Sequence, residues 1–173
     1  MAMRLSYAGE LGWELHMPNA ACLDVYNALT AAGAPFGLTD YGSFAMNVLR
    51  MEKAFKSTEK NYLGKDETLA NADNLPWICA YLEIEPDGVT DGHGGEAVRF
   101  EGKVVGSTAS VVFSPTVNKI LAFAYIKPDA ARPGTQLEVI IAGQPRSAVV
   151  RADAVYDPQS LLPRTDDTRE AVA

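Results

Sequence analysis

The chain has 173 residues, of which 47% are hydrophobic, and it carries a formal net charge of −7. This length and apolar content allow one domain or two small ones, each with a buried core. The acidic balance repels phosphate groups and the basic residues are scattered, so we expect no nucleic acid and no membrane among the partners. No apolar stretch approaches the about 20 residues that cross a bilayer, and no targeting segment is evident, so a cytoplasmic protein is expected.

Cysteine and histidine are too sparse to indicate a disulfide framework or a metal centre. Cys22 and Cys79 show no CxxC spacing, which indicates a reducing compartment. His16 and His93 lie far apart in the sequence without a cluster of metal ligands around them. We therefore expect no structural metal.

The chain opens with the pattern of a β-hairpin. Strands at residues 4–7 and 13–17 flank a glycine-containing turn. Because side chains alternate along a strand, Glu14 is expected on the face opposite Trp13 and Leu15. A two-stranded sheet with one apolar face needs another layer to bury that face.

Two amphipathic helices are predicted next, at residues 20–32 and from about residue 40 to 55. Each carries an apolar stripe at helical spacing: Leu23, Tyr26 and Leu29 on the first, and Phe44, Val48, Met51 and Phe55 on the second. We expect the second stripe to be buried. The polar side of the second helix holds Arg50, Glu52 and Lys53, of which Arg50 and Glu52 are interpreted as structural.

From Trp77 the pattern changes to short runs rich in β-branched and aromatic residues, separated by turn residues. Six strands are predicted, at 78–85, 97–100, 104–113, 119–125, 135–141 and 146–155. Such strands indicate a small antiparallel barrel or sandwich. The predicted fold class is α+β, with a partial α/β sandwich (the hairpin plus two helices) followed by a small six-stranded antiparallel β-barrel.

We place the domain boundaries where the pattern changes. Residues 1–60 form the partial α+β domain, 61–76 a connector with at most a short helix near 66–70, 77–160 the barrel, and 161–173 a polar tail. The first domain is marginal alone, because two strands and two helices bury too little apolar surface. We expect a partner chain or a second copy to cover it.

Five segments carry a recognisable pattern: SYAGELGWE at 6–14, LRMEK at 49–53, YLGK at 62–65, the run 106–125 that contains FSPTVNK, and YDP at 156–158. In this order they resemble the glycine cleavage T-protein family of aminomethyltransferases, which includes the folate-binding regions of dimethylglycine and sarcosine dehydrogenases. The first is similar to the family's Tyr-Thr-Gly-Glu-x-Gly-x-Glu segment, and the second to its Leu-Arg-Leu-Glu-Lys helix.

The resemblance implies a tetrahydrofolate cofactor that accepts a one-carbon unit from a small methylated amine or an aminomethyl donor. It implies that Glu14 binds the pterin ring, because two carboxylate oxygens match the adjacent ring donors, and that Tyr7 stacks on that ring. The alternatives are a solvated glutamate on a polar strand face and an ordinary half-buried strand aromatic. No catalytic residue is assigned.

Three departures from the family pattern affect the expected activity. The region that bears the family's catalytic aspartate has no counterpart here, a further segment is omitted between Ser57 and Tyr62, and Met46 stands where the glycine cleavage enzyme has a folate-holding arginine. We therefore expect a folate-binding lobe that is inactive without a partner chain. The alternative is a non-catalytic binding or assembly module derived from the same family.

Overall fold

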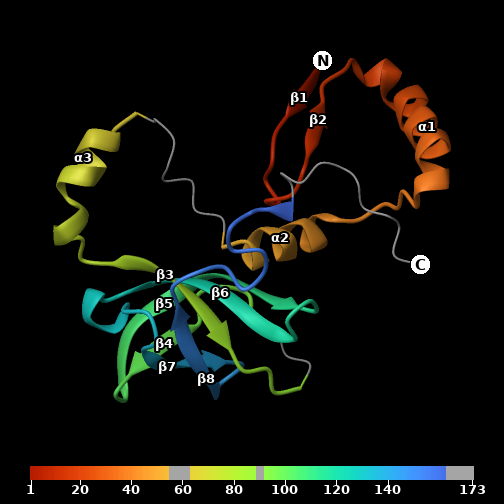
Figure 1. The fold of residues 1–173 in the computed structure, drawn as a ribbon. Coiled ribbons are helices and arrows are strands. Elements are labelled where there is room, and N and C mark those ends of the chain that lie inside the picture. The colour runs from red at the N-terminus through yellow and green to blue at the C-terminus, as the bar shows by residue number, and fades with distance from the viewer. Residues whose placement is uncertain (55–62, 89–91, 163–173) are drawn as a thin grey trace.

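The structure is a computed structural model and describes residues 1–54, 63–88 and 92–162. A β-barrel forms one end of the molecule, and a small hairpin and helix α1 stand apart from it at the other end (Figure 1). Helix α2 (Ser43–Glu52) lies between the two parts and contacts strands β5 and β6 of the barrel. The polar tail predicted at 161–173 falls largely outside the described residues.

The predicted antiparallel barrel is confirmed, and it closes on itself. Its strands are β3 (Ile78–Ile84), β4 (Ala97–Phe100), β5 (Lys103–Ser114), β6 (Lys119–Ile126), β7 (Gln136–Ile141) and β8 (Gln144–Arg151). The neighbour order is β3-β6-β5-β4-β7-β8, and β8 pairs back onto β3. Strand β8 ends at Arg151 and not at residue 155, because the ladder to β3 stops at the Tyr81 and Arg151 pair.

Two strands of the barrel are buried on both faces. Inward side chains such as Leu82, Ala122 and Val139 form the barrel core. On the outer face, Tyr81 and Phe123 pack with Met51 of α2, and the two rings lie 5.4 Å apart. Residues 80–82 and 120–124 therefore form continuous buried runs, as expected for strands covered on both sides.

The hairpin is shorter and wider at its turn than predicted. Strands β1 (Ala2–Arg4) and β2 (Trp13–Leu15) pair, with Met3 opposite Glu14. The first strand does not reach residue 7, because residues 5–12 form a loop in which Ser6 Oγ donates to the Glu10 carbonyl at 2.5 Å.

The remaining helical elements are the 3-10 turn η1 (Asn19–Ala21), α1 (Cys22–Gly33), the turn η2 (Ala34–Phe36), α3 (Lys65–Ala70), the turn η3 (Ala72–Asn74), and η4 (Pro128–Ala130) between β6 and β7. Among them, α1 and α3 correspond to the helices predicted at 20–32 and near 66–70, whereas the four 3-10 turns that the structure describes were not predicted. None of the helices that the structure describes is both long and apolar enough to cross a membrane.

The burial predicted for the second helix was wrong at both of its ends, at Phe44 near the start and at Glu52 and Lys53 near the end. Phe44 is 89% exposed, while Met51 is fully buried; Phe55 lies outside the described residues. Conversely, Glu52 and Lys53, placed on the polar side by the helical period, are 1% and 7% exposed. The reason is that the C-terminal end of α2 inserts between the barrel and the 5–12 loop, so both of its sides are covered there.

Candidate functional site

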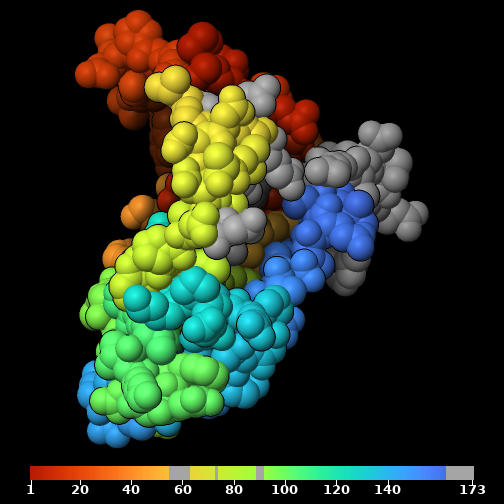
Figure 2. All heavy atoms as spheres, turned by 90° about the vertical axis from the view of Figure 1, so that its left-hand side faces the viewer, coloured from red at the N-terminus to blue at the C-terminus, as the bar shows by residue number. Residues whose placement is uncertain are grey.

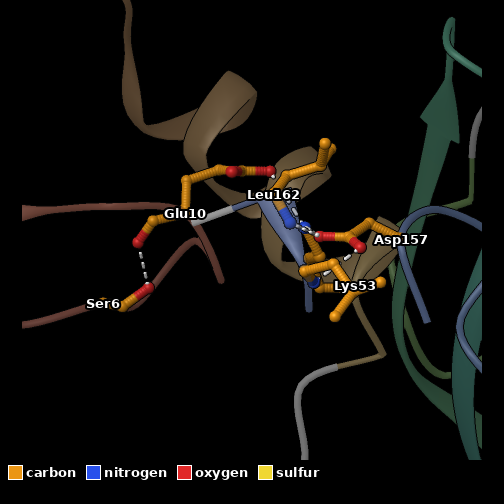
Figure 3. A network of polar contacts seen from close by, with 6 residues as sticks. Ser6, Glu10, Lys53, Asp157 and Leu162 are labelled. Atoms are coloured by element: carbon orange, nitrogen blue, oxygen red, sulfur yellow. Dashed lines mark hydrogen bonds and ion pairs between the residues drawn. The ribbon is translucent and has the colours of Figure 1, made fainter. Parts of the chain in front are cut away.

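A buried lysine joins three segments that are distant in the sequence (Figure 3). Lys53 Nζ lies 2.6 Å from Asp157 Oδ2 and 3.2 Å from Glu10 Oε1, and its side chain is 1% exposed. The same ammonium lies 4.9 Å from the centroid of the Tyr156 ring. We call these four residues the Lys53 clasp, because they tie the 5–12 loop, the end of α2 and the segment after β8 together.

The charges of the clasp stabilise one another. Burial lowers the pKa of Lys53, but its hydrogen bonds to Asp157 and Glu10 outweigh burial and the net shift is upward. The hydrogen bond from Lys53 holds the pKa of Asp157 below its usual value. Both groups are therefore charged at neutral pH, and the buried ammonium is compensated by two carboxylates.

Backbone contacts fix both segments that carry the carboxylates, the one with Asp157 and the loop with Glu10. The Asp157 carboxylate accepts the amide N–H groups of Leu161 at 2.9 Å and Leu162 at 3.2 Å, which folds the chain back after β8. In the 5–12 loop, Gly9 is buried with φ +76°, and a Cβ there would lie 2.6 Å from Lys53 Cγ. A residue without a side chain is therefore required where the loop packs on the lysine stem.

Arg50 connects the loop to the barrel from the same helix. Its guanidinium carbon lies 5.7 Å from the Tyr7 ring centroid and 5.5 Å from that of Phe123. A second contact orients it, because Nη2 donates to Asn47 Oδ1 at 3.0 Å. Cation–π contacts to two rings hold Tyr7 over the wall of the barrel.

A buried carboxylate anchors α2 to the barrel. Ser114 Oγ donates to Glu52 Oε1 at 2.5 Å, and the Tyr156 amide donates to the Glu52 carbonyl at 3.2 Å. Both side chains are nearly fully buried. Glu52 thus has a structural role, as predicted, but through the barrel and not through a neighbour on its own helix.

The two predicted cofactor residues lie open to solvent. The Glu14 side chain is 55% exposed and its Oε2 lies 3.2 Å from His16 Nε2. Tyr7 is also 55% exposed. Within the described part of the chain no hydrogen bond or ring contact joins the two, and no group of three histidine, cysteine or acidic side chains could hold a metal ion.

Sequence reasoning missed the clasp. Glu10 lies within the SYAGELGWE segment and Asp157 within YDP, and neither pattern indicates that both side chains pair with Lys53. The sequence carries one weak signal, the position of Lys53 two residues after Met51, the last described residue of the apolar stripe of α2. Its partners lie 43 residues earlier and 104 residues later, so no local periodicity could identify them.

Known proteins resemble this chain along nearly its whole length. A family model described as the GCVT N-terminal domain matches residues 1–81. A second, described as the glycine cleavage T-protein C-terminal barrel domain, matches residues 79–157. The crystal structure of glycine cleavage system aminomethyltransferase T from Bartonella henselae superposes with a TM-score of 0.74 at 17% identity, covering 91% of this chain and 50% of that one.

Curated relatives agree with this likeness. Human mitochondrial dimethylglycine dehydrogenase is 34% identical, over 86% of this chain and 20% of that protein. Mouse mitochondrial sarcosine dehydrogenase is 34% identical, over 76% of this chain and 17% of that protein. An aminomethyltransferase from Thermoanaerobacter pseudethanolicus is 26% identical, over 90% of this chain and 48% of its own length.

The chain spans 20% or less of these two dehydrogenases and 48% of this aminomethyltransferase. The two family models together account for residues 1–157, and both describe parts of one protein type. The chain belongs to the glycine cleavage T-protein family.

Proposed function

We propose that this chain binds a reduced folate through Glu14 and Tyr7, as the folate-binding lobe of a one-carbon transferase. The donor would be a small methylated amine or an aminomethyl group, the chemistry named in its dehydrogenase and aminomethyltransferase relatives. The observation that carries the proposal is that both motif side chains are more than half exposed, while the loop that joins them is fixed at Glu10 by a buried lysine.

Glu14 offers a carboxylate that can change partners at little cost. Its only hydrogen-bond partner among the described residues is His16, at 3.2 Å, and both side chains are about half exposed. An exposed pair of this kind contributes little stability. A pterin edge with two adjacent donors would make two charge-assisted hydrogen bonds to the same carboxylate, which is the stronger arrangement.

Tyr7 offers a ring whose position is already fixed. The Arg50 guanidinium holds it against the barrel, and more than half of its surface remains open for stacking. Less conformational entropy is therefore lost when a second ring stacks on it.

Lys53 is a positioning residue in this proposal. It contacts Glu10, which lies between Tyr7 and Glu14 in the sequence, so it restrains the loop that carries both. Loss of that restraint should weaken folate binding without removing any group that touches the ligand.

The proposal is tested by calorimetric titration of tetrahydrofolate into the parent chain, Glu14→Gln and Glu138→Gln. Glu138 is the matched control, because it is also an exposed glutamate on a strand, β7. Glu10 would be a poor control, since it belongs to the Lys53 clasp.

Glu14→Gln should bind about tenfold or more weakly, because hydrogen bonds to a charged group contribute roughly 1.5–3 kcal/mol and each tenfold step is about 1.4 kcal/mol. Glu138→Gln should match the parent. Equal binding by the parent and Glu14→Gln would remove Glu14 from the site. No binding by the parent would contradict the folate proposal and favour an assembly module.

A specific observation favours that second candidate. The hairpin, α1, η2 and the start of α2 expose large apolar side chains; Leu23 of α1 is 67% exposed and Phe36 of η2 is 88% exposed. Patches of this kind mark interaction sites. We propose that the surface is covered by polypeptide equivalent to the rest of the aminomethyltransferase, since the Bartonella henselae structure contains about as much chain again as the part that matches.

If the catalytic carboxylate belongs to that covering polypeptide, this chain alone should show no folate-dependent transfer, since such a group contributes ~10²-fold or more. It should also self-associate through the open surface. Sedimentation velocity of the parent and of a Leu23→Ser, Leu29→Ser variant checks this. A clean monomer for the parent at micromolar concentration, or turnover without added protein, would contradict the need for covering polypeptide.

A further inference from the structure

A small pocket lies on the outer wall of the barrel and shares no residue with the Lys53 clasp. Its volume is about 220 Å³, and it is lined by Trp77, Gly106, Ser107 and Tyr125. Figure 2 shows the side of the molecule on which the segment between α3 and β3 comes down onto the barrel, the segment that contains Trp77. Trp77 is 44% exposed and Tyr125 54% exposed, so both rings present surface to solvent.

Strand register brings these side chains to one face. Ser107 lies opposite Tyr125, and Gly106 and Ile78 both lie opposite the buried Ile126. Because successive residues alternate, Tyr125 and Ser107 point outward. Gly106 lets β5 approach β6 closely, since a Cβ there would lie 2.0 Å from the Tyr125 carbonyl oxygen. The floor of the pocket is therefore bare backbone.

A lysine without a carboxylate partner stands at the edge of this pocket. Lys127 Nζ lies 4.2 Å from the centroid of the Trp77 ring, and its backbone amide donates to the Val105 carbonyl at 2.9 Å. Among the described residues no acidic side chain pairs with it.

We propose that this pocket binds a small planar aromatic carboxylate. The ring would pack against Trp77 and Tyr125, and the carboxylate would accept a hydrogen bond from Lys127. Aromatic rings prefer offset-stacked or edge-to-face contacts with such a ligand. The Lys127 ammonium lies over the Trp77 ring and can attract the carboxylate of the ligand from that position, without losing its own contact with the ring.

Size and charge favour a single anionic ring. The volume is below the about 300 Å³ at which pockets for drug-sized ligands begin, so it matches a one-ring ligand. Aromatic pockets also bind organic cations, but here the Lys127 ammonium already lies over the Trp77 face and repels a second positive charge.

The test uses benzoate as the probe and benzamide as its uncharged counterpart. Trp13 and Trp77 are the two tryptophans of the chain, so their indole N–H signals in a nitrogen–proton correlation spectrum report on two separate places. A Trp13→Phe variant assigns the signals. We expect benzoate to shift the Trp77 signal saturably and to leave the Trp13 signal unmoved.

Benzamide should bind about threefold to fivefold more weakly, because an exposed ion pair contributes up to about 1 kcal/mol. Lys127→Gln, just after β6, should remove this preference, while Lys119→Gln at the other end of β6 should keep it. The same spectra show whether each variant is folded. Equal affinity for the two probes, equal shifts at both tryptophans, no shift at Trp77, or an unchanged preference in Lys127→Gln would each overturn the proposal.

Discussion

The barrel and the N-terminal region are stabilised in different ways, the first by a buried core and the second by a few contacts. Every barrel strand has two neighbours, and residues such as Leu82, Val98 and Leu121 are completely buried. Between Met1 and Arg50, by contrast, Gly9 is the single buried residue. A closed barrel buries its own core, whereas a two-stranded hairpin with one helix cannot. The N-terminal region is therefore held by a few contacts at its base, chiefly those of Lys53 and Arg50, and not by a core of its own.

The largest effect should come from a truncation inside the barrel. Leu82→Ala removes a fully buried side chain from the core and should lower the free energy of unfolding by about 2–5 kcal/mol. Urea denaturation followed by far-ultraviolet circular dichroism measures it. A loss below about 0.5 kcal/mol, the size of an ordinary surface change, would show that the barrel core is not the main source of stability.

Removing the lysine at the base of the N-terminal region should act locally. Lys53→Met leaves Glu10 and Asp157 without their cation, so the 5–12 loop should open more often. Cleavage of that loop by a protease should become about tenfold faster if opening becomes easier by about 1.4 kcal/mol. Lys119→Met, which breaks the pair with Glu85 on the barrel, is the matched control and should leave the loop unchanged. Equal cleavage of parent and Lys53→Met would mean that the clasp does not hold the loop.

The restraint that the Lys53 clasp places on the 5–12 loop should weaken at low and at high pH. The pKa of Asp157 is lowered, so its contribution is present above the ordinary value of 3.8 and is lost as the pH falls through the lowered value. The pKa of Lys53 is raised, so its contribution is present below 10.5 and is lost as the pH rises through the raised value.

The protection of the 5–12 loop amides against hydrogen exchange should therefore stay constant between pH 3.8 and 10.5 and decline outside this range. In Lys53→Met this pH dependence of the protection should be lost. Glu96 also has a lowered pKa, through hydrogen bonds that outweigh its burial, so global acid unfolding would not isolate the clasp. Hydrogen exchange of the loop amides gives the local readout. A parent and variant with the same pH profile would contradict the assignment.

The smallest effect is expected on the open face of α1. Leu23 is 67% exposed, so Leu23→Ser should change the free energy of unfolding by no more than about 0.5 kcal/mol, in contrast to Leu82→Ala. Denaturation of the two variants under the same conditions compares the regions directly. A loss as large as that of Leu82→Ala would mean that α1 contributes to a core after all.

The difference between the regions also explains what could be predicted from the sequence. The six barrel strands were predicted within a few residues, because alternation and turn residues act locally. The burial of Lys53 and Glu52 could not be predicted, because it depends on Asp157 and Ser114, which are distant in the sequence. Periodicity placed Glu14 and Tyr7 on a hairpin, but their proposed roles came only from a resemblance of motifs.

The packing of Gly9 on Lys53 has an evolutionary consequence. Because a Cβ at position 9 would overlap the lysine stem, these two positions cannot vary independently, although they are 44 residues apart. A relative that carries alanine or a larger residue at position 9 should have a shorter side chain at position 53, and with it should lose the acidic partners at 10 and 157. Covariation among these four positions would reveal the clasp in sequences whose structures are not known.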